Sequence, residues 1–481
     1  MIPFRGLKTR LTYLCASMSA LSCVAGCAVG PDYHKPDVSM PANWQSQTAF
    51  QPAQPNDAQL KGPWWEMFGD AQLNQLEQQA LQHNQSLQVA AEHLKQARLQ
   101  VTVLSSAQLP QVGLQASDAR FKTSADRPLA AYGITNQSTV QNNPQLGLTV
   151  SYEADLFGRV RRVVESVQAA AAQAAADLEN AKLILMAELA SDYFNLRELD
   201  AEIDIVRQGV ELQQRALNFI RVRHDLDIAT GLDLAQQQAL LDTNTTQLTL
   251  LQNQRAALQN ALSTLTGTAA PDFKLAAQVI NLVAPGLPVG MPADVLQRRP
   301  DIASAERAMA IANANIGVAR AAYYPSLMLS ATGGWDSNKM SNLLTAPSLL
   351  WSLGASMTQT LFDAGKTTAN VNIAESSYVA ALANYRQSVL VALQEVQTGI
   401  DSTTLLNNAQ MRAQAAVDSS ARVLELSNAR YKGGLDIYLN VISAQQALLS
   451  SQRQAVQIRG QQMTNAVYLV KALGGGWQQS N

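Results

Sequence analysis

The chain contains little cysteine and little charge. Its 481 residues include only three cysteines, all close to the start: Cys15, Cys23 and Cys27. If the first 26 residues are removed, Cys27 alone remains, so a disulfide within the mature chain is excluded. Charged residues make up 15% of the chain and the formal net charge is −2. We therefore expect no basic surface for nucleic acid and no nucleic-acid partner.

Long hydrophobic runs and helix-breaking prolines are also scarce. No run of about 18 or more apolar residues occurs, so the sequence predicts no membrane-spanning helix in the mature chain. Proline is absent from 145–270 and from 348–481, which leaves room for long uninterrupted helices.

Recognisable catalytic patterns are missing as well. HExxH, GxSxG and phosphate-loop motifs do not occur, and the four histidines do not have the spacing of a metal pair on one helix. We therefore expect no enzymatic activity, no metal and no cofactor other than a covalent lipid.

The start of the chain has the pattern of a secretory signal. Three basic residues precede a moderately apolar stretch: Arg5, Lys8 and Arg10. That stretch ends in Val24-Ala25-Gly26-Cys27, which is typical of a bacterial lipoprotein cleavage site. We predict that 1–26 is removed and that Cys27 carries acyl chains, each buried methylene adding about 0.8 kcal/mol to membrane binding. The alternative is an ordinary signal peptide with incidental cysteines.

The two halves of the remaining chain resemble each other. The stretches 143–158 and 347–363 each hold an alternating strand pattern followed by Leu-Phe. Farther on, LDLAQQQALL from Leu232 is similar to LNVISAQQALL from Leu439. The offset is about 205 to 215 residues throughout, which indicates an internal two-fold repeat.

Each half predicts the same order of elements: a helix, two strands, a long helix and a shorter return helix. The expected strands are 112–121, 145–154, 327–335 and 351–361. The expected helices are 71–108, 156–223 and 232–266 in the first half, and 293–323, 364–431 and 436–472 in the second. In domain terms, we expect a signal peptide (1–26), a lipidated N-terminal segment (27–70), a first repeat (71–267), a connecting belt (268–292), a second repeat (293–475) and a C-terminal tail (476–481).

The strands alternate between apolar and polar residues. Val150 and Leu353 fall on one face, and Thr149 and Ser352 on the other. Four strands cannot close a barrel, because barrels need about eight or more, whereas three chains together would supply twelve. We therefore expect a mainly α chain with a small membrane β part. Its trimer would form an α-helical barrel of coiled-coil hairpins continuing into a shared 12-stranded β-barrel, with four strands per chain. The apolar face would meet lipid and the polar face the lumen.

Several stretches resemble the outer membrane factor family, the TolC-like exit ducts of tripartite efflux systems. They are CAVGPDY (27–33), PWWEMFGDAQLNQL (63–76), the segment 298–325 and LGGGWQ (473–478). The resemblance implies a homotrimer in the outer membrane of a Gram-negative bacterium, lipid-anchored and extending into the periplasm. It also implies a periplasmic adaptor protein and an inner-membrane efflux transporter as partners. The duct would passively conduct small toxic compounds or drugs. The alternative function is a periplasmic coiled-coil adaptor or scaffold lipoprotein.

The two turns that end the long helices are candidates for the periplasmic mouth of such a duct. The candidate gate residues are Asp225, Asp227, Asp233, Arg430, Tyr431, Asp436 and Asn440. Arg430 and Tyr431 are expected to reach a neighbouring carboxylate such as Asp233 or Asp227. Helix capping and solvation are the alternative role for each of these residues. Ser443 stands where the family often carries aspartate, so it cannot contribute to an acidic ring at the mouth.

Overall fold

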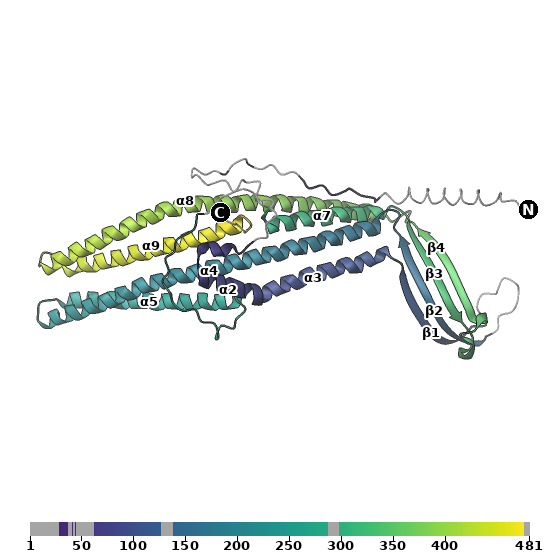
Figure 1. The fold of residues 1–481 in the computed structure, drawn as a ribbon, viewed down its shortest axis with the longest axis horizontal. Coiled ribbons are helices and arrows are strands. Elements are labelled where there is room, and N and C mark those ends of the chain that lie inside the picture. Colours follow the sequence, from purple (N-terminus) through teal and green to yellow (C-terminus); the bar gives the residue numbers. More distant parts are fainter. Residues whose placement is uncertain are drawn as a thin grey trace, which may run out of the picture. The chain divides into compact units, whose positions relative to one another are not determined.

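The computed structural model describes residues 28–36, 41, 44, 62–126, 138–286 and 298–475. Within these residues the chain is mainly helical, with one four-stranded sheet (Figure 1). It divides into two compact units. The sheet unit comprises Met1–Pro36, Leu94–Ala174 and Ala305–Tyr385, and the hairpin unit comprises the rest of the chain.

The sheet unit contains four antiparallel strands in the order β1-β2-β3-β4. They are β1 (Gln111–Lys122), β2 (Val140–Ala154), β3 (Ser326–Asp336) and β4 (Leu349–Thr358). The strand expected from 145 begins earlier, because Val140 pairs with Lys122 through a polar stretch that lacks alternation. The strand expected to reach 361 ends at Thr358, where its pairing with Ser326 of β3 ends.

The register gives this sheet one apolar and one polar face, as the alternation predicts. One row of cross-strand neighbours is apolar: Val112, Val150, Ala331 and Leu353. The adjacent row is small and polar: Gly113, Thr149, Thr332 and Ser352. In that second row the hydroxyl oxygens of Thr332 and Ser352 lie 2.6 Å apart, so they share a hydrogen bond.

The segment 28–36 is bound tightly within the sheet unit, beside the start of helix α4 (Arg159–Asp225). The Val29 N–H donates to the carbonyl of Phe157 at 3.0 Å. Arg162 is buried and donates to Gly30 O and, at 2.8 Å, to the carboxylate of Asp32. A β-carbon at Gly30 would lie 2.5 Å from the backbone of Gly317, so only glycine fits this close approach. The chain immediately after Cys27 is therefore fixed at the strand-to-helix junction.

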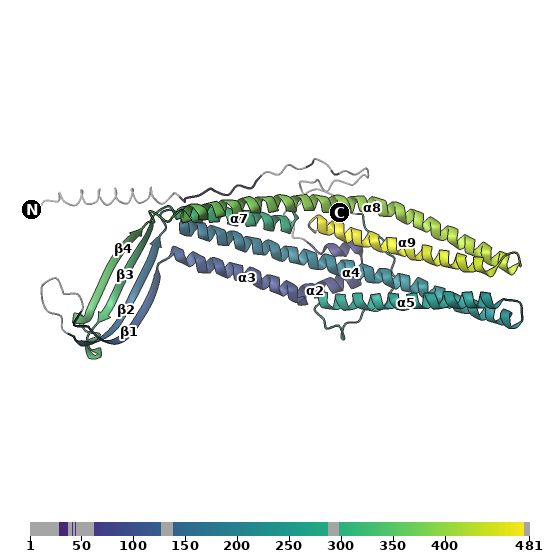
Figure 2. The ribbon, with the colours of Figure 1, turned by 180° about the vertical axis from the view of Figure 1, so that it is seen from behind.

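The hairpin unit contains two helical hairpins, except for the first part of each long helix, which belongs to the sheet unit. The first consists of α4 and α5 (Gly231–Leu265), and the second of α8 (Lys366–Lys432) and α9 (Tyr438–Ala472). Their turns lie side by side at one end of this unit, and α9 runs between α8 and α4 (Figures 1 and 2). The absence of proline from these stretches permits helices of this length.

The leading helices are shorter than expected. The helix predicted over 71–108 is divided into α2 (Ala71–His83) and α3 (Gln85–Ser105), followed by one 3-10 turn. Asn84 causes the break: its side chain accepts from Leu87 N–H at 2.9 Å and donates to Leu265 O at 2.9 Å. The second leading helix is α7 (Pro300–Ala321), and the expected residues 293–297 lie outside the described part.

A hydrophobic cluster forms the core of the hairpin unit. It joins Trp64 and Trp65, 3% and 4% exposed, to α2 and to the middle of α4, including Tyr193 and Leu196. The Tyr193 hydroxyl donates to Asp70, which also caps α2. In the described residues no helix has the length and apolar character needed to cross a membrane.

Candidate functional site

The turn between α4 and α5 holds the three predicted aspartates. Asp225 is exposed, with its carboxylate 3.9 Å from His224 Nδ1. Asp227 has a φ of 55°, and this left-handed backbone conformation turns the chain. Asp233 and Thr230 form a capping box, in which each side chain accepts from the other residue's N–H, at 3.1 and 3.0 Å. Within one chain, Asp233 therefore stabilises the start of α5.

The turn between α8 and α9 brings three predicted residues together. Arg430 Nε lies 3.1 Å from Asp436 Oδ2, and Asn440 donates to the other carboxylate oxygen at 2.6 Å. The Arg430 guanidinium, the Asn440 amide and the Ile437 N–H lower the pKa of Asp436. Gly434, at a φ of 71°, allows the tight turn. This hairpin tip therefore has a charge-paired turn.

The contact between the two tips depends on residues outside the predicted set. The Tyr438 hydroxyl donates to Gln237 Oε1 at 2.7 Å, and both side chains are buried. Gln237 in turn donates to the Gln213 carbonyl of α4 at 3.1 Å. Burial, followed by the nearby Tyr431, raises the pKa of Tyr438 to about 12, so its hydroxyl stays protonated. This chain of hydrogen bonds joins α9 to α5 and α4.

Tyr431 is the one predicted gate residue whose aromatic ring contributes to this contact. Its ring centroid lies 5.0 Å from that of Tyr438 and 5.4 Å from the Arg223 guanidinium carbon. Ile220, Leu240 and the first turn of α9 surround the pair with apolar side chains. The tips are thus held together by aromatic, cation–π and buried hydrogen-bond contacts.

Sequence reasoning missed Arg223, Gln237 and Tyr438. Gln237 lies in a run of three glutamines, which suggests a solvated surface, and nothing local marks one of them as buried. Among the described residues of one chain, the ion pair of Arg430 is with Asp436 rather than with Asp227 or Asp233. The expected pairing of Arg430 with Asp227 or Asp233 stays a prediction. Cys27 lies outside the described residues.

Farther along α4, buried ion pairs join the hairpin helices. Arg197 and Asp200 are each 1% exposed and lie 2.9 Å apart. Arg255 of α5 approaches Asp200 at 2.5 Å, and Arg453 of α9 approaches Glu202 at 2.6 Å. Buried pairs of this kind fix helix positions because separating them leaves a charge unpaired.

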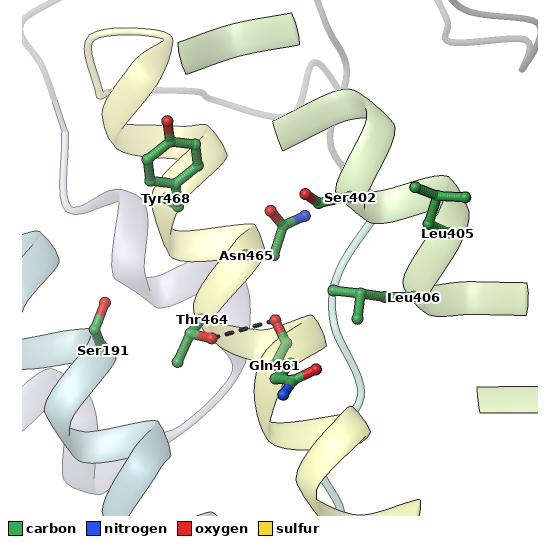
Figure 3. A pocket seen from close by; sticks show the side chains of 8 residues that line it. All are labelled: Ser191, Ser402, Leu405, Leu406, Gln461, Thr464, Asn465 and Tyr468. Carbon is green, nitrogen blue, oxygen red and sulfur yellow. Dashed lines mark hydrogen bonds between the residues drawn. The ribbon is translucent and has the colours of Figure 1, made fainter. Parts of the chain in front are cut away.

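An open groove of about 650 Å³ lies among α4, α8 and α9 (Figure 3). Its lining is uncharged: Ser191, Ser402, Leu405, Leu406, Gln461, Thr464, Asn465 and Tyr468. Asn465 extends toward α8 and donates to Gly399 O at 3.1 Å. The described residues hold no cluster of three potential metal ligands. This groove therefore offers hydroxyl and amide contacts, and no charged side chain lines it.

Known proteins resemble nearly the whole chain. The family model described as "Outer membrane efflux protein" matches 76–268 and 291–475. A toluene efflux pump outer membrane protein of Pseudomonas putida, TtgF, is 31% identical over 473 residues, covering 97% of each chain. A solvent efflux pump outer membrane protein of the same species, SrpC, is 32% identical over 467 residues, covering 96% of this chain and 98% of its own.

Solved channel structures share the fold. The outer-membrane channel OprN superposes with a TM-score of 0.86 at 30% identity, covering 94% of this chain and 100% of its own. The Campylobacter jejuni CmeC outer membrane channel gives 0.87 at 26% identity, covering 95% and 96%. Family members are transport proteins rather than enzymes. With a family model matching most of the chain and relatives aligned over nearly all of it, this protein belongs to the outer membrane efflux protein family.

Proposed function

We propose that this chain is the exit duct of a tripartite efflux system and acts as a homotrimer in the outer membrane. The observation that carries the proposal is the sheet: one face is apolar, and both edge strands, β1 and β4, are exposed along their whole length. Unpaired strand edges cannot lie in lipid, because their N–H and C=O groups would have no partners. Joining β4 of one chain to β1 of the next removes every edge and yields twelve strands from three chains.

Matching elements in the two halves of the chain support this assembly. The family model matches the chain as two separate segments. Each contains a pair of strands, a long helix of 67 residues and a return helix of 35 residues. Because the helices have equal lengths, the two hairpins can pack as equivalent units around a helical barrel.

A lipid on Cys27 would lie where the membrane surface is expected. Cys27 is bonded directly to Ala28, and consecutive Cα atoms are about 3.8 Å apart. Ala28 lies against Gly158, between the end of β2 and the start of α4. Because the segment after Ala28 is bound to Arg162, the acyl chains would start at the junction between strands and helices.

The hairpin tips would form the periplasmic mouth, and polar contacts would close it at rest. A periplasmic adaptor and an inner-membrane transporter would be the partners that open it. We propose small apolar or drug-like compounds as cargo, since the relatives are named for toluene, solvent and antibiotic efflux. A largely polar lumen face that includes Thr149, Thr332 and Ser352, with Glu153 and Asp336 toward its two ends, suits passive conduction without a binding pocket.

The test is purification from outer-membrane fractions followed by cross-linking and planar-bilayer recording. We expect a trimer that conducts ions across the bilayer. A protein that stays monomeric, or that is recovered only from the soluble periplasmic fraction, would contradict the proposal. The latter result would restore the alternative of a periplasmic adaptor or scaffold lipoprotein.

A further inference from the structure

A second contact between the two hairpins lies away from their tips, where α4 meets α9. Glu198 and Glu202 are one helical turn apart on α4 and face α9. Glu202 is 2% exposed and accepts from Arg453 at 2.6 Å. Gln457 lies 3.3 and 3.4 Å from the two oxygens of Glu202. Glu202 thus has its full set of donors from α9.

Glu198 has no comparable set. Its Oε1 is buried without a hydrogen-bond partner among the described residues. Gly460 of α9 fits closely over it, since a β-carbon at Gly460 would lie 2.5 Å from Glu198 Cγ. The side chain cannot turn past α9 while the two helices stay in contact.

The local charges do not balance when both glutamates are ionised. Glu202 and Arg453 are the charged groups that act on Glu198, and Gln457 and Gly460 on α9 are neutral. The other buried charges of this part of α4, Arg197 and Asp200, face α5 and the segment that follows it. Burial first, and then the neighbouring Glu202, raise the pKa of Glu198 to about 7.

We propose that Glu198 makes the contact between α4 and α9 sensitive to protons, holding the two hairpins together when it is protonated and loosening them when it is ionised. Only the functional consequence rests on the proposed function: in an exit duct, a mildly acidic periplasm would favour a closed tunnel. The contact itself is a property of the hairpin unit alone.

The direction follows from linkage between proton binding and helix separation. If the helices part, Glu198 reaches water and its pKa returns toward its ordinary value of 4.5. The helix contact then binds the proton more tightly than the parted state, so it weakens as the pH rises from 4.5 toward 7. Between pH 5.5 and 7.5 the equilibrium between contact and separation should shift roughly 20-fold.

Hydrogen–deuterium exchange of the full chain in nanodiscs tests this directly. Peptides of α9 between 446 and 463 are followed from pH 5.5 to pH 8.0, and rates are corrected for intrinsic chemical exchange. We expect protection of the wild-type peptides to fall roughly tenfold or more across this range and to level off just above pH 7. Glu198→Gln, which stays neutral, should remain protected throughout. Glu211→Gln, an exposed position on the same helix, is the matched control and should behave as wild type.

Arg453→Gln separates proton sensitivity from simple packing. Removing the cation should move the pH at which protection levels off to a higher value, whereas a purely structural role would lower protection equally at every pH. Identical profiles for wild type and Glu198→Gln, or an unchanged levelling-off pH in Arg453→Gln, would overturn the proposal. If the same preparation shows no conductance, the proposed function as a duct is contradicted. The exchange result still tests the proton-sensitive helix contact.

Discussion

At the scale of single residues, Glu77 is a carboxyl group inside an apolar core. It is 0% exposed, and neither carboxyl oxygen has a hydrogen-bond partner among the described residues. Burial raises its pKa to about 9, so the folded protein holds it protonated at neutral pH. At any pH where Glu77 would be ionised in the unfolded chain, keeping it protonated in the core therefore lowers the free energy of unfolding.

We predict that Glu77→Gln stabilises the protein, and more so at high pH. The carboxyl binds its proton more tightly in the folded state, so wild-type stability falls as the pH rises from about 4.5 toward 9. The gain at pH 7 should be up to about 3 kcal/mol per chain. Thermal unfolding of both proteins at pH 5 and pH 8 measures it, with Glu211→Gln as the exposed control. Equal differences in Tm at the two pH values would argue against a buried neutral carboxyl.

The contacts at the hairpin tips lead to a second prediction about single residues. Tyr438→Phe keeps the ring but leaves Gln237 without its buried donor, at a cost of about 1–3 kcal/mol. The double change Arg430→Ser with Tyr431→Phe removes the charge pair with Asp436 and the Tyr431 hydroxyl. We expect both variants to raise conductance in planar bilayers, and the double variant to alter ion selectivity, while the trimer stays stable.

Glu211→Gln, an exposed position on α4 outside the two turns, serves as the control for conductance. Its conductance should stay close to that of the unmodified trimer. Unchanged conductance in both Tyr438→Phe and the double variant would mean that these contacts do not close the mouth.

At the scale of elements, the two faces of the sheet can be compared by placing lysine on each. Val150 and Leu353 share the apolar row, whereas Thr149 and Ser352, one residue away on the same strands, share the polar row. Lysine at either apolar position should reduce trimer insertion, because a lysine at mid-membrane depth costs about 2–4 kcal/mol. Lysine at Thr149 or Ser352 should be tolerated. The measurement is the yield of trimer in outer-membrane fractions. Similar yields for all four variants would contradict the assignment of the apolar row to the lipid.

At the scale of the whole molecule, the lipid anchor and the membrane sheet can be tested separately. Cys27→Ser should abolish acylation and leave a mislocalised or soluble precursor, with some function surviving because the strands themselves can insert. Labelling with radioactive palmitate and membrane fractionation measure both effects. Cys23→Ser, which alters only the signal peptide, is the control. Continued labelling of the Cys27 variant would show that the cleavage site was assigned wrongly.

Much of the fold was predictable because it depends on local periodicity. The alternation along Leu146–Tyr152 predicts which side chains share a sheet face. The absence of proline predicts the length of the long helices. The errors occur where a long-range partner decides the local structure. Asn84 divides a predicted helix because Leu265 offers it a carbonyl, and β2 extends to Val140 because Lys122 lies opposite.

The sequence by itself determined the family, the amphipathic strands, the helical hairpins and the positions of their turns. Only the tertiary structure decided which polar residues join the hairpins. Gln237 and Tyr438 are 201 residues apart, and Glu202 and Arg453 are 251 apart. A buried glutamine or glutamate has the same local pattern as a solvated one. Its partner comes from a distant segment, so its role is fixed only when the chain has folded and water has been excluded around it.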